Sequence, residues 1–456
     1  MSTPDSLTLS GVDVLALAAL AAGALALALR AAKSRRAGVE DYVLAGRALT
    51  LPAFVATLVP SFFGGTLGVG EYTWRYGVSN WLAQGAPYYL FAVLYAVWLV
   101  PRVRAGGGLT IPDQLEAAFG RRAAVLGALL VFVLASPADE FLMLGTLVSW
   151  AGGWPLPACV AGVAVLAVAT LWRGGLRSDV GANKLEAVVM FLGFAVILPF
   201  ALKDAGGLGA MAAALPASHR DWSGGQPVSA LAGWWLIALW TFVDPGFHQR
   251  VLAAQDERTA RAGILTSVAL WAVFDAMTTT AGLLARARLP DLAEPLSAYP
   301  ALAEAVLPPF LKGVFIAGVA ASTLAATAST TLLAAVSLGR DAAGRALGAP
   351  QEDQEAWTRA ALGAAAVLGA ALALALPSVV ALWYTVGSCV IPGLLVPLLA
   401  ATTPSLRVGP RAGLASSAAG VAAASAAWWL GSALPFGWGL AASLAVWTPA
   451  RLLKKA

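Results

Sequence analysis

Charged residues are scarce in this chain of 456 amino acids. Asp, Glu, Lys and Arg together make up 12% of the residues, against 59% hydrophobic residues, and the mean hydropathy is +0.77. Soluble domains carry about 25% charged residues, so we exclude a soluble fold and predict a protein of the lipid bilayer. The net charge of +5 does not indicate nucleic acid as a partner, because Lys and Arg fall in short clusters between apolar segments.

Cysteine and histidine are nearly absent too, with two of each. Cys159 and Cys389 lie inside apolar runs without CxxC or Cys/His spacing, so neither a disulfide framework nor a metal cluster is predicted. The chain also lacks the HExxH, GxGD and Ser/His patterns of membrane-embedded hydrolases. An enzyme is therefore not expected.

Long apolar segments dominate what is present. A membrane helix needs about 20 apolar residues, and on this basis the sequence predicts an all-α polytopic membrane protein with about 13 transmembrane helices. Most of the 29 Lys and Arg residues lie in alternate loops. The positive-inside rule then places the N-terminus outside and the C-terminus in the cytoplasm, in the cell (inner) membrane. The predicted helices start near residues 11, 51, 80, 122, 157, 186, 229, 262, 310, 358, 378, 411 and 434.

Two of these segments contain helix-breaking residues. The second is broken by Pro60, Gly64 and Gly65, and the seventh by Asp244, Pro245 and Gly246. Backbone groups freed by a break in lipid must face protein, water, an ion or a solute, and matching breaks in two halves indicate a transporter's binding site. We therefore predict that Gly64, Gly65 and Asp244 lie at the site.

The positions of the breaks predict the domain organisation. Helices 2–6 and 7–11 are expected to form a 5+5 inverted repeat, in which each five-helix unit opens with a broken helix. The chain is then a single transporter domain, residues 1–456. Its parts are residues 1–48 (helix 1 and the first inner loop), 49–205 (first repeat), 226–403 (second repeat) and 404–456 (two C-terminal helices and a basic tail).

Four stretches in order along the chain resemble a known family. They are residues 41–47 (DYVLAGR), 109–121 (LTIPDQLEAAFGR), 174–177 (GGLR) and 244–254 (DPGFHQRVLAA). In these stretches the chain is similar to the sodium:solute symporters, which include bacterial proline, pantothenate and sugar transporters. The resemblance implies a leucine-transporter-like fold, alternating access, and a cation bound between helices 2 and 9.

The resemblance also implies ligands for that cation. Matching the family's pattern to helix 9 places Thr327 as a hydroxyl ligand and Thr323 as a carbonyl ligand, while Ala326 stands where a serine is usual. The carbonyls of Ala56 and Val59 would complete the site from helix 2, and Ser329 and Thr330 are further hydroxyl candidates on helix 9. The alternative is that these hydroxyls bond to carbonyls of their own helix.

Lys184 departs from the family's pattern. It occupies a position where the family has a carboxylate on the sodium route, so its ammonium is a candidate for coupling in which H⁺ replaces Na⁺. The other interpretation is that Lys184 lies at the end of helix 6 and extends to the interface. Coupling to Na⁺, coupling to H⁺ and no coupling all remain open.

Family position assigns a further group to the substrate site and gate, namely Gln84, Tyr88, Trp240, Thr241 and Tyr384. Independently, a charge deep in an apolar run is costly and is therefore a functional candidate, which singles out Asp139, Glu140, Asp244 and Asp275. Glu71 and Arg75 are expected to pair at the entrance.

The prediction is a symporter, functional as a monomer, that imports a small organic solute such as an amino acid or carboxylate. The alternative of another class is a substrate sensor that does not transport.

Overall fold

The computed structural model describes residues 7–34, 36 and 38–455, and this part of the chain is built from helices and turns without a strand. One isolated bridge joins Leu49, just before the second predicted span, to Ala254, just after the seventh. The predicted segments 1–48 and 404–456 include residues 1–6, 35, 37 and 456, which lie outside the described residues.

The helices of the first half of the chain are α1 (Gly11–Ala32), α2 (Val39–Leu44), α3 (Leu51–Phe62), α4 (Thr66–Tyr76), α5 (Ala86–Leu94), α6 (Val100–Gly106), α7 (Ile111–Phe119), α8 (Arg121–Leu134), α9 (Ala138–Gly152) and α10 (Leu156–Asp204). Single 3₁₀ turns occur at Ala45–Arg47 and Phe63–Gly65, and π-helical turns at Trp81–Gly85 and Tyr95–Leu99. The last of these helices bends at Gly175, whose φ of 53° is in the region that glycine tolerates best.

The second half contains α11 (Leu208–Ala214), α12 (Ala217–Arg220), α13 (Val228–Ile237), α14 (Trp240–Val243), α15 (Pro245–Ala253), α16 (Glu257–Arg288), α17 (Ala298–Val306), α18 (Leu311–Ala335), α19 (Arg345–Leu347), α20 (Gln354–Ala375), α21 (Val379–Thr402), α22 (Pro410–Trp429) and α23 (Pro435–Lys455). The π-helical segment Val336–Gly344 continues α18, and 3₁₀ turns occur at Pro295–Ser297, Gln351–Asp353 and Pro404–Leu406.

Ten stretches of the described chain are helices long and apolar enough to cross a membrane, which confirms a multi-pass all-α protein. They are Gly11–Ala32, Leu51–Tyr76, Trp81–Gly106, Arg121–Gly152, Gly174–Asp204, Val228–Ala253, Glu257–Arg288, Leu311–Leu347, Gln354–Ala375 and Val379–Thr402. Of the other predicted spans, Leu156–Trp172 is a shorter apolar helix, and α22 and α23 are helices that do not belong to this set. The count of thirteen spans stays a prediction.

The sixth predicted span starts earlier than expected. The sequence predicts a beginning near residue 186, but the helix begins at Gly174. Its early turns carry charged residues, which are typical of a loop. In the structure Arg177 pairs with Asp41 at 2.6 Å, and Asp179 is buried 3.7 Å from Arg250, so pairing lets these charges lie within the helix.

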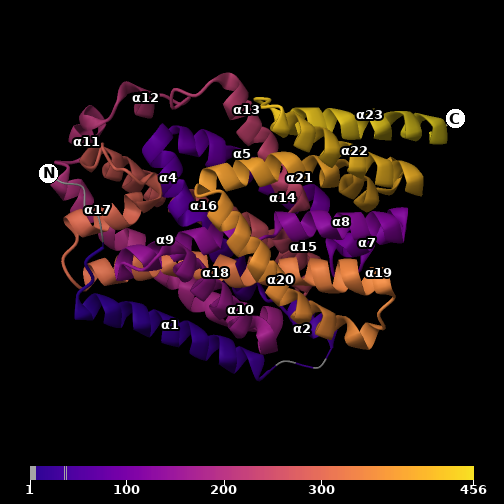
Figure 1. Cartoon of the computed structure of the whole chain (residues 1–456), viewed down its shortest axis with the longest axis horizontal. Coiled ribbons are helices and arrows are strands. Elements are labelled where there is room, and N and C mark those ends of the chain that lie inside the picture. Colours follow the sequence, from indigo (N-terminus) through magenta and orange to yellow (C-terminus); the bar gives the residue numbers. More distant parts are fainter. Residues whose placement is uncertain (1–6, 35, 37, 456) are drawn as a thin grey trace.

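The helices run mostly along the long axis of the molecule, horizontally in Figure 1. The N-terminal helix α1 begins at the left-hand end and the C-terminal helix α23 finishes at the right-hand end. Among the pairings inside the bundle, α10 contacts α18 extensively. A Cβ placed on Gly193 would lie 3.0 Å from the Cα of Gly318, so small residues allow these two backbones to approach closely.

Both predicted breaks are interruptions of the helix. Pro60 lies inside α3, which continues to Phe62 before the 3₁₀ turn Phe63–Gly65 leads into α4. In the seventh span Asp244 is extended, with φ −66° and ψ 117°, between α14 and α15. A third interruption, between α8 and α9 around Pro137, was not predicted.

Candidate functional site

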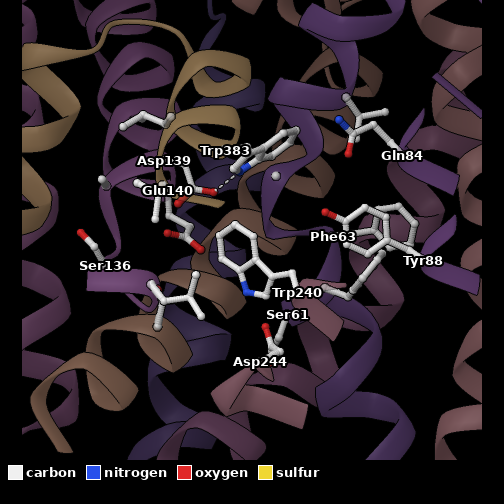
Figure 2. A pocket seen from close by; sticks show the side chains of 18 of the residues that line it. Ser61, Phe63, Gln84, Tyr88, Ser136, Asp139, Glu140, Trp240, Asp244 and Trp383 are labelled. Atoms are coloured by element: carbon white, nitrogen blue, oxygen red, sulfur yellow. Dashed lines mark hydrogen bonds between the residues drawn. The ribbon is translucent and has the colours of Figure 1, made fainter. Parts of the chain in front are cut away.

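A cavity of about 200 Å³ lies where the three interruptions meet. Its lining comes from the break between α3 and α4, from the start of α9, from α14 and Asp244, and from α5, α16, α18 and α21 (Figure 2). The lining residues are Ser61, Phe62, Phe63, Gly65, Val69, Gln84, Tyr88, Val133, Leu134, Ser136, Ala138, Asp139, Glu140, Trp240, Asp244, Asp275, Thr330, Leu382, Trp383 and Val386. Segments far apart in the sequence therefore enclose one small space.

The cavity wall is acidic. The carboxylates of Asp139, Glu140, Asp244 and Asp275 line it, and none of the lining residues among the described part of the chain is Lys, Arg or His. All four are the acidic residues that the cost of charge in apolar runs singled out in the sequence.

Three of these carboxylates accept hydrogen bonds. The indole Nε1 of Trp383 donates to Asp139 at 2.8 Å, and the hydroxyl of Tyr89 donates to Asp275. Asp244 accepts from the backbone N–H of Phe247 at 2.7 Å and so caps the start of α15. Such bonds stabilise ionised carboxylates away from water.

Aromatic side chains form much of the rest of the wall. In Figure 2 the indole of Trp240 lies in the middle, with Asp139 and Glu140 on one side of it and Gln84, Phe63 and Tyr88 on the other. Phe62, which also lines the cavity, stacks on Trp271 with ring centroids 4.0 Å apart and meets Tyr88 edge-on at 5.8 Å. The rings give the cavity a rigid apolar surface.

Most of the predicted substrate and gate residues meet at this cavity. Those that line it are Gly65, Gln84, Tyr88, Trp240 and Asp244, together with Thr330 from the predicted cation set. The side chain of Gln84 is carried on the π-helical turn Trp81–Gly85, a distortion that is frequent at functional sites.

The structure does not bring Gly64, Thr241 and Tyr384 to the cavity lining. A Cβ on Gly64 would overlap that of Ala326, so Gly64 packs against α18. The hydroxyl of Thr241 donates to the carbonyl of Ala238 at 3.0 Å, and that of Tyr384 donates to the carbonyl of Ala433 at 2.9 Å. The neighbour of Tyr384, Trp383, faces the cavity in its place, and sequence reasoning missed it.

Several of the predicted cation ligands have partners within their own helices. Thr327 donates to the carbonyl of Thr323 at 2.6 Å and Thr330 to that of Ala326 at 2.9 Å, while the N–H of Phe63 bonds to the carbonyl of Val59. A donating hydroxyl still offers lone pairs to a cation. On α3 the carbonyl of Ala56 gains no bond from residue 60, because Pro60 has no N–H.

Ser329 belongs to a different group of side chains, centred on Arg250. The guanidinium Nη2 of Arg250 donates to Ser61 at 2.8 Å and to Ser329 at 2.9 Å. The same nitrogen lies 3.7 Å from Asp179, and both charged residues are almost completely buried. Arg250 thus connects α15, α3, α18 and α10 beside the cavity.

Lys184 is exposed on α10, whereas its neighbour Asn183 is buried and donates to the hydroxyl of Thr57 at 2.7 Å. The polar residue that faces the interior at this level is therefore Asn183.

The expected pair of Glu71 and Arg75 is confirmed, with 3.2 Å between the charged atoms, and Ser378 also donates to Glu71 at 2.8 Å.

Comparison with known proteins agrees with this architecture. The chain resembles a solved Na⁺-coupled sialic acid symporter with a TM-score of 0.79 and 15% identity, covering 97% of this chain and 98% of the other. It resembles a nucleobase-cation-symport-1 family transporter with a TM-score of 0.62 and 15% identity, covering 91% and 94%. These likenesses show the leucine-transporter-like fold.

Sequence comparison identifies the family. The sodium/pantothenate symporter of Escherichia coli (strain K12) is 24% identical over 328 residues, and the match spans only 66% of its length and 66% of this chain. The pattern of the sodium:solute symporter family matches residues 42–399. These relatives are transporters and not enzymes. The chain belongs to the sodium:solute symporter family.

Proposed function

We propose that this protein is a secondary active transporter of the cell (inner) membrane, which imports a small organic solute by alternating access coupled to Na⁺. The observation that carries the proposal is the cavity of about 200 Å³ enclosed by interrupted helices. Drug-sized ligands occupy pockets of about 300–1,000 Å³, so a solute of the size of an amino acid fits better than a larger one.

The membrane topology is part of the proposal. Thirteen spans, with the N-terminus outside and the C-terminus in the cytoplasm, agree with the opposite ends of the molecule at which α1 begins and α23 finishes (Figure 1). Helices 2–6 and 7–11 would form the inverted repeat. Interruptions in the opening helix of each unit support this. We propose that a monomer is functional.

The Na⁺ site of the proposal lies between α3 and α18, with ligands from Ala56, Val59, Thr323 and Thr327. The carbonyl of Ala56, which Pro60 deprives of its helical partner, supports a role for α3. Oxygen ligands of this kind suit a hard cation.

One observation favours the alternative of H⁺ coupling or no coupling. Ser329, a predicted cation ligand, accepts instead from the guanidinium of Arg250, and Ala326 has no hydroxyl to offer. Lys184 is a weaker support for this alternative, because it is exposed. A non-transporting sensor with the same fold would bind solute without moving it.

Uptake into proteoliposomes tests the proposal. With a panel of labelled amino acids, amines and carboxylates, an inward Na⁺ gradient should drive accumulation, and Thr327→Ala should abolish the stimulation by Na⁺. Thr280→Ala is the matched control, since Thr280 makes the same bond to its own helix, at 2.7 Å to Ala276, but is exposed on α16. Uptake driven only by an H⁺ gradient would favour the alternative, and no uptake of any panel member would refute transport.

A further inference from the structure

The charge of the cavity narrows the class of solute. We propose that the substrate is an organic cation carrying an amine or a quaternary ammonium group, recognised by the paired carboxylates of Asp139 and Glu140 and by the surrounding aromatic rings. This inference rests on the proposed transport function and names the chemistry that the same cavity selects.

The balance of charge in the cavity is the first argument. Four carboxylates line it, and no basic residue of the described part of the chain does. The guanidinium of Arg250 is held by Ser61, a lining residue, and by Ser329, and it lies beside Asp179. It can offset the charge of Asp179, but it is not among the described residues that line the cavity.

Glu140 supplies an independent argument. Its side chain is 4% exposed, and its Oε2 atom has no hydrogen-bond partner. Figure 2 shows it beside Asp139, on the side of the cavity that faces Trp240. A buried carboxylate oxygen without a partner is costly, so a donor or a cation that enters from the cavity would stabilise Glu140.

The start of α9 is a favourable place for these two acidic side chains. Asp139 and Glu140 lie in the first turn of α9, where the free N–H groups and the helix dipole favour negative charge. The indole of Trp383 adds a hydrogen bond to Asp139 at 2.8 Å. The helix start and the indole thus favour negative charge on this pair, and no basic side chain among the described lining residues offsets it.

The kinds of side chain that line the cavity favour an organic cation over a metal ion. Among the described residues no group of three or more His, Cys, Asp and Glu side chains has metal-binding geometry. Instead Trp240, Trp383, Tyr88 and Phe63 line the cavity together with the acids. Aromatic faces attract ammonium groups and are most effective where water is excluded.

A matched pair of molecules tests the role of charge directly. Choline and 3,3-dimethylbutan-1-ol have nearly the same shape, but only choline is charged. Quenching of Trp fluorescence in the purified full-length protein should show choline binding at least about tenfold more tightly than the alcohol, as expected for a charged hydrogen-bonding or ionic partner. Putrescine against butane-1,4-diol extends the comparison to primary amines. Equal affinities within each pair would overturn the inference.

Variants of the two carboxylates test whether they cause the preference for cations. Glu140→Gln and Asp139→Asn should each weaken binding of the preferred cation by about tenfold or more and leave the binding of its neutral analogue unchanged. Glu257→Gln is the control, since Glu257 is an exposed acid that pairs with Arg261 on the surface of α16. Unchanged cation affinity in both cavity variants would overturn the inference, and the two wild-type pairs test it even if one variant fails to fold.

Transport measurements separate the two proposals. Uptake of choline or putrescine, with succinate and proline excluded, supports both. Uptake of succinate or proline without uptake of either cation overturns the cationic substrate and leaves the transporter standing. Charge-dependent binding without uptake of any solute supports the cationic ligand and refutes transport.

Discussion

At the level of single residues, Arg250 is a charged side chain buried among three other helices. Its side chain is 1% exposed and donates to Ser61 and Ser329 while lying 3.7 Å from Asp179. The planar guanidinium suits this task because its donors are arranged in a rigid fork, whereas a lysine offers a single charged nitrogen. Arg250 therefore joins the interrupted seventh span to the helices that face it.

Removing this guanidinium should destabilise the protein. We expect Arg250→Met to lower the free energy of unfolding by about 3–5 kcal/mol, because Asp179 would stay buried without its charged partner. Asp179→Leu in the same molecule should recover part of that loss. The apparent Tm of the detergent-solubilised protein measures both effects, and Arg258→Met, at an exposed position on α16, is the control. Strictly additive losses would show that the two charges are not coupled.

Among the helices, the interruption between α3 and α4 depends on close packing against α18. A Cβ on Gly64 would overlap the Cβ of Ala326 and lie 3.6 Å from the carboxylate of Glu140. There is no room for a methyl group, because both neighbours are buried. Ala326, which stands where the family usually has a serine, thus packs directly against Gly64, and the two small residues together allow this contact.

We predict that Gly64→Ala abolishes uptake and lowers the apparent Tm, since the break must move away from α18. Overpacking of this kind costs about 1–3 kcal/mol. Ala326→Gly should restore much of the stability in the double variant, because it removes the atom that clashes. Gly363→Ala on α20 provides the control: nothing lies within 4 Å of the position that its new methyl group would take, so it should be neutral or slightly stabilising. A Gly64→Ala protein with normal uptake would contradict this packing argument.

The cost of buried charge located residues of the cavity more reliably than family position did. Asp139, Glu140 and Asp275 were found by the cost of burying charge, a rule that needs no knowledge of helix rotation, and all three line the cavity. Tyr384 was placed by family position and faces elsewhere, although Trp383 beside it faces the cavity. Successive residues of a helix point about 100° apart, so an error of one position moves a side chain to another face.

The interruptions of the helices were predictable in part from the sequence. Gly64 and Gly65 marked one of them and Pro245 and Gly246 the other, because glycine and proline disfavour helices in any context. The break before α9 was missed, since Pro137 follows Ser136 in a segment that otherwise has the length of one span. The early start of the sixth span was missed because the burial of Asp179 depends on Arg250, a residue of another helix.

For the molecule as a whole, a cluster of ion pairs ties distant parts of the chain together at the right-hand end of Figure 1, where α7 and α19 lie. Asp113 on α7 pairs with Arg340 at 3.0 Å and also with Arg345. Arg345 in addition contacts Glu116 at 2.7 Å and Asp341 at 2.5 Å. A network of several partly buried pairs contributes more than isolated surface pairs do, so it should hold α7 against the end of α18.

This cluster predicts how stability depends on pH. Burial by itself would raise the pKa of Asp113, but the guanidiniums of Arg340 and Arg345 outweigh it and bring the pKa below its ordinary value of 3.8. Because the pKa is lower in the folded than in the unfolded protein, the ionised group stabilises the fold above about pH 4, and this contribution is lost as the pH falls through the folded-state pKa.

Asp113→Asn should therefore lower the free energy of unfolding by about 2–4 kcal/mol near neutral pH, as expected for the loss of a buried ion-pair partner. The difference in apparent Tm from the unmodified protein should stay constant from about pH 8 to pH 5 and shrink below about pH 4, where Asp113 becomes protonated in both states. Asp353→Asn, an exposed change, controls for the general effect of acid. A difference that grows as the pH falls would mean that the paired form is the protonated one, and that α7 is held by something other than these charges.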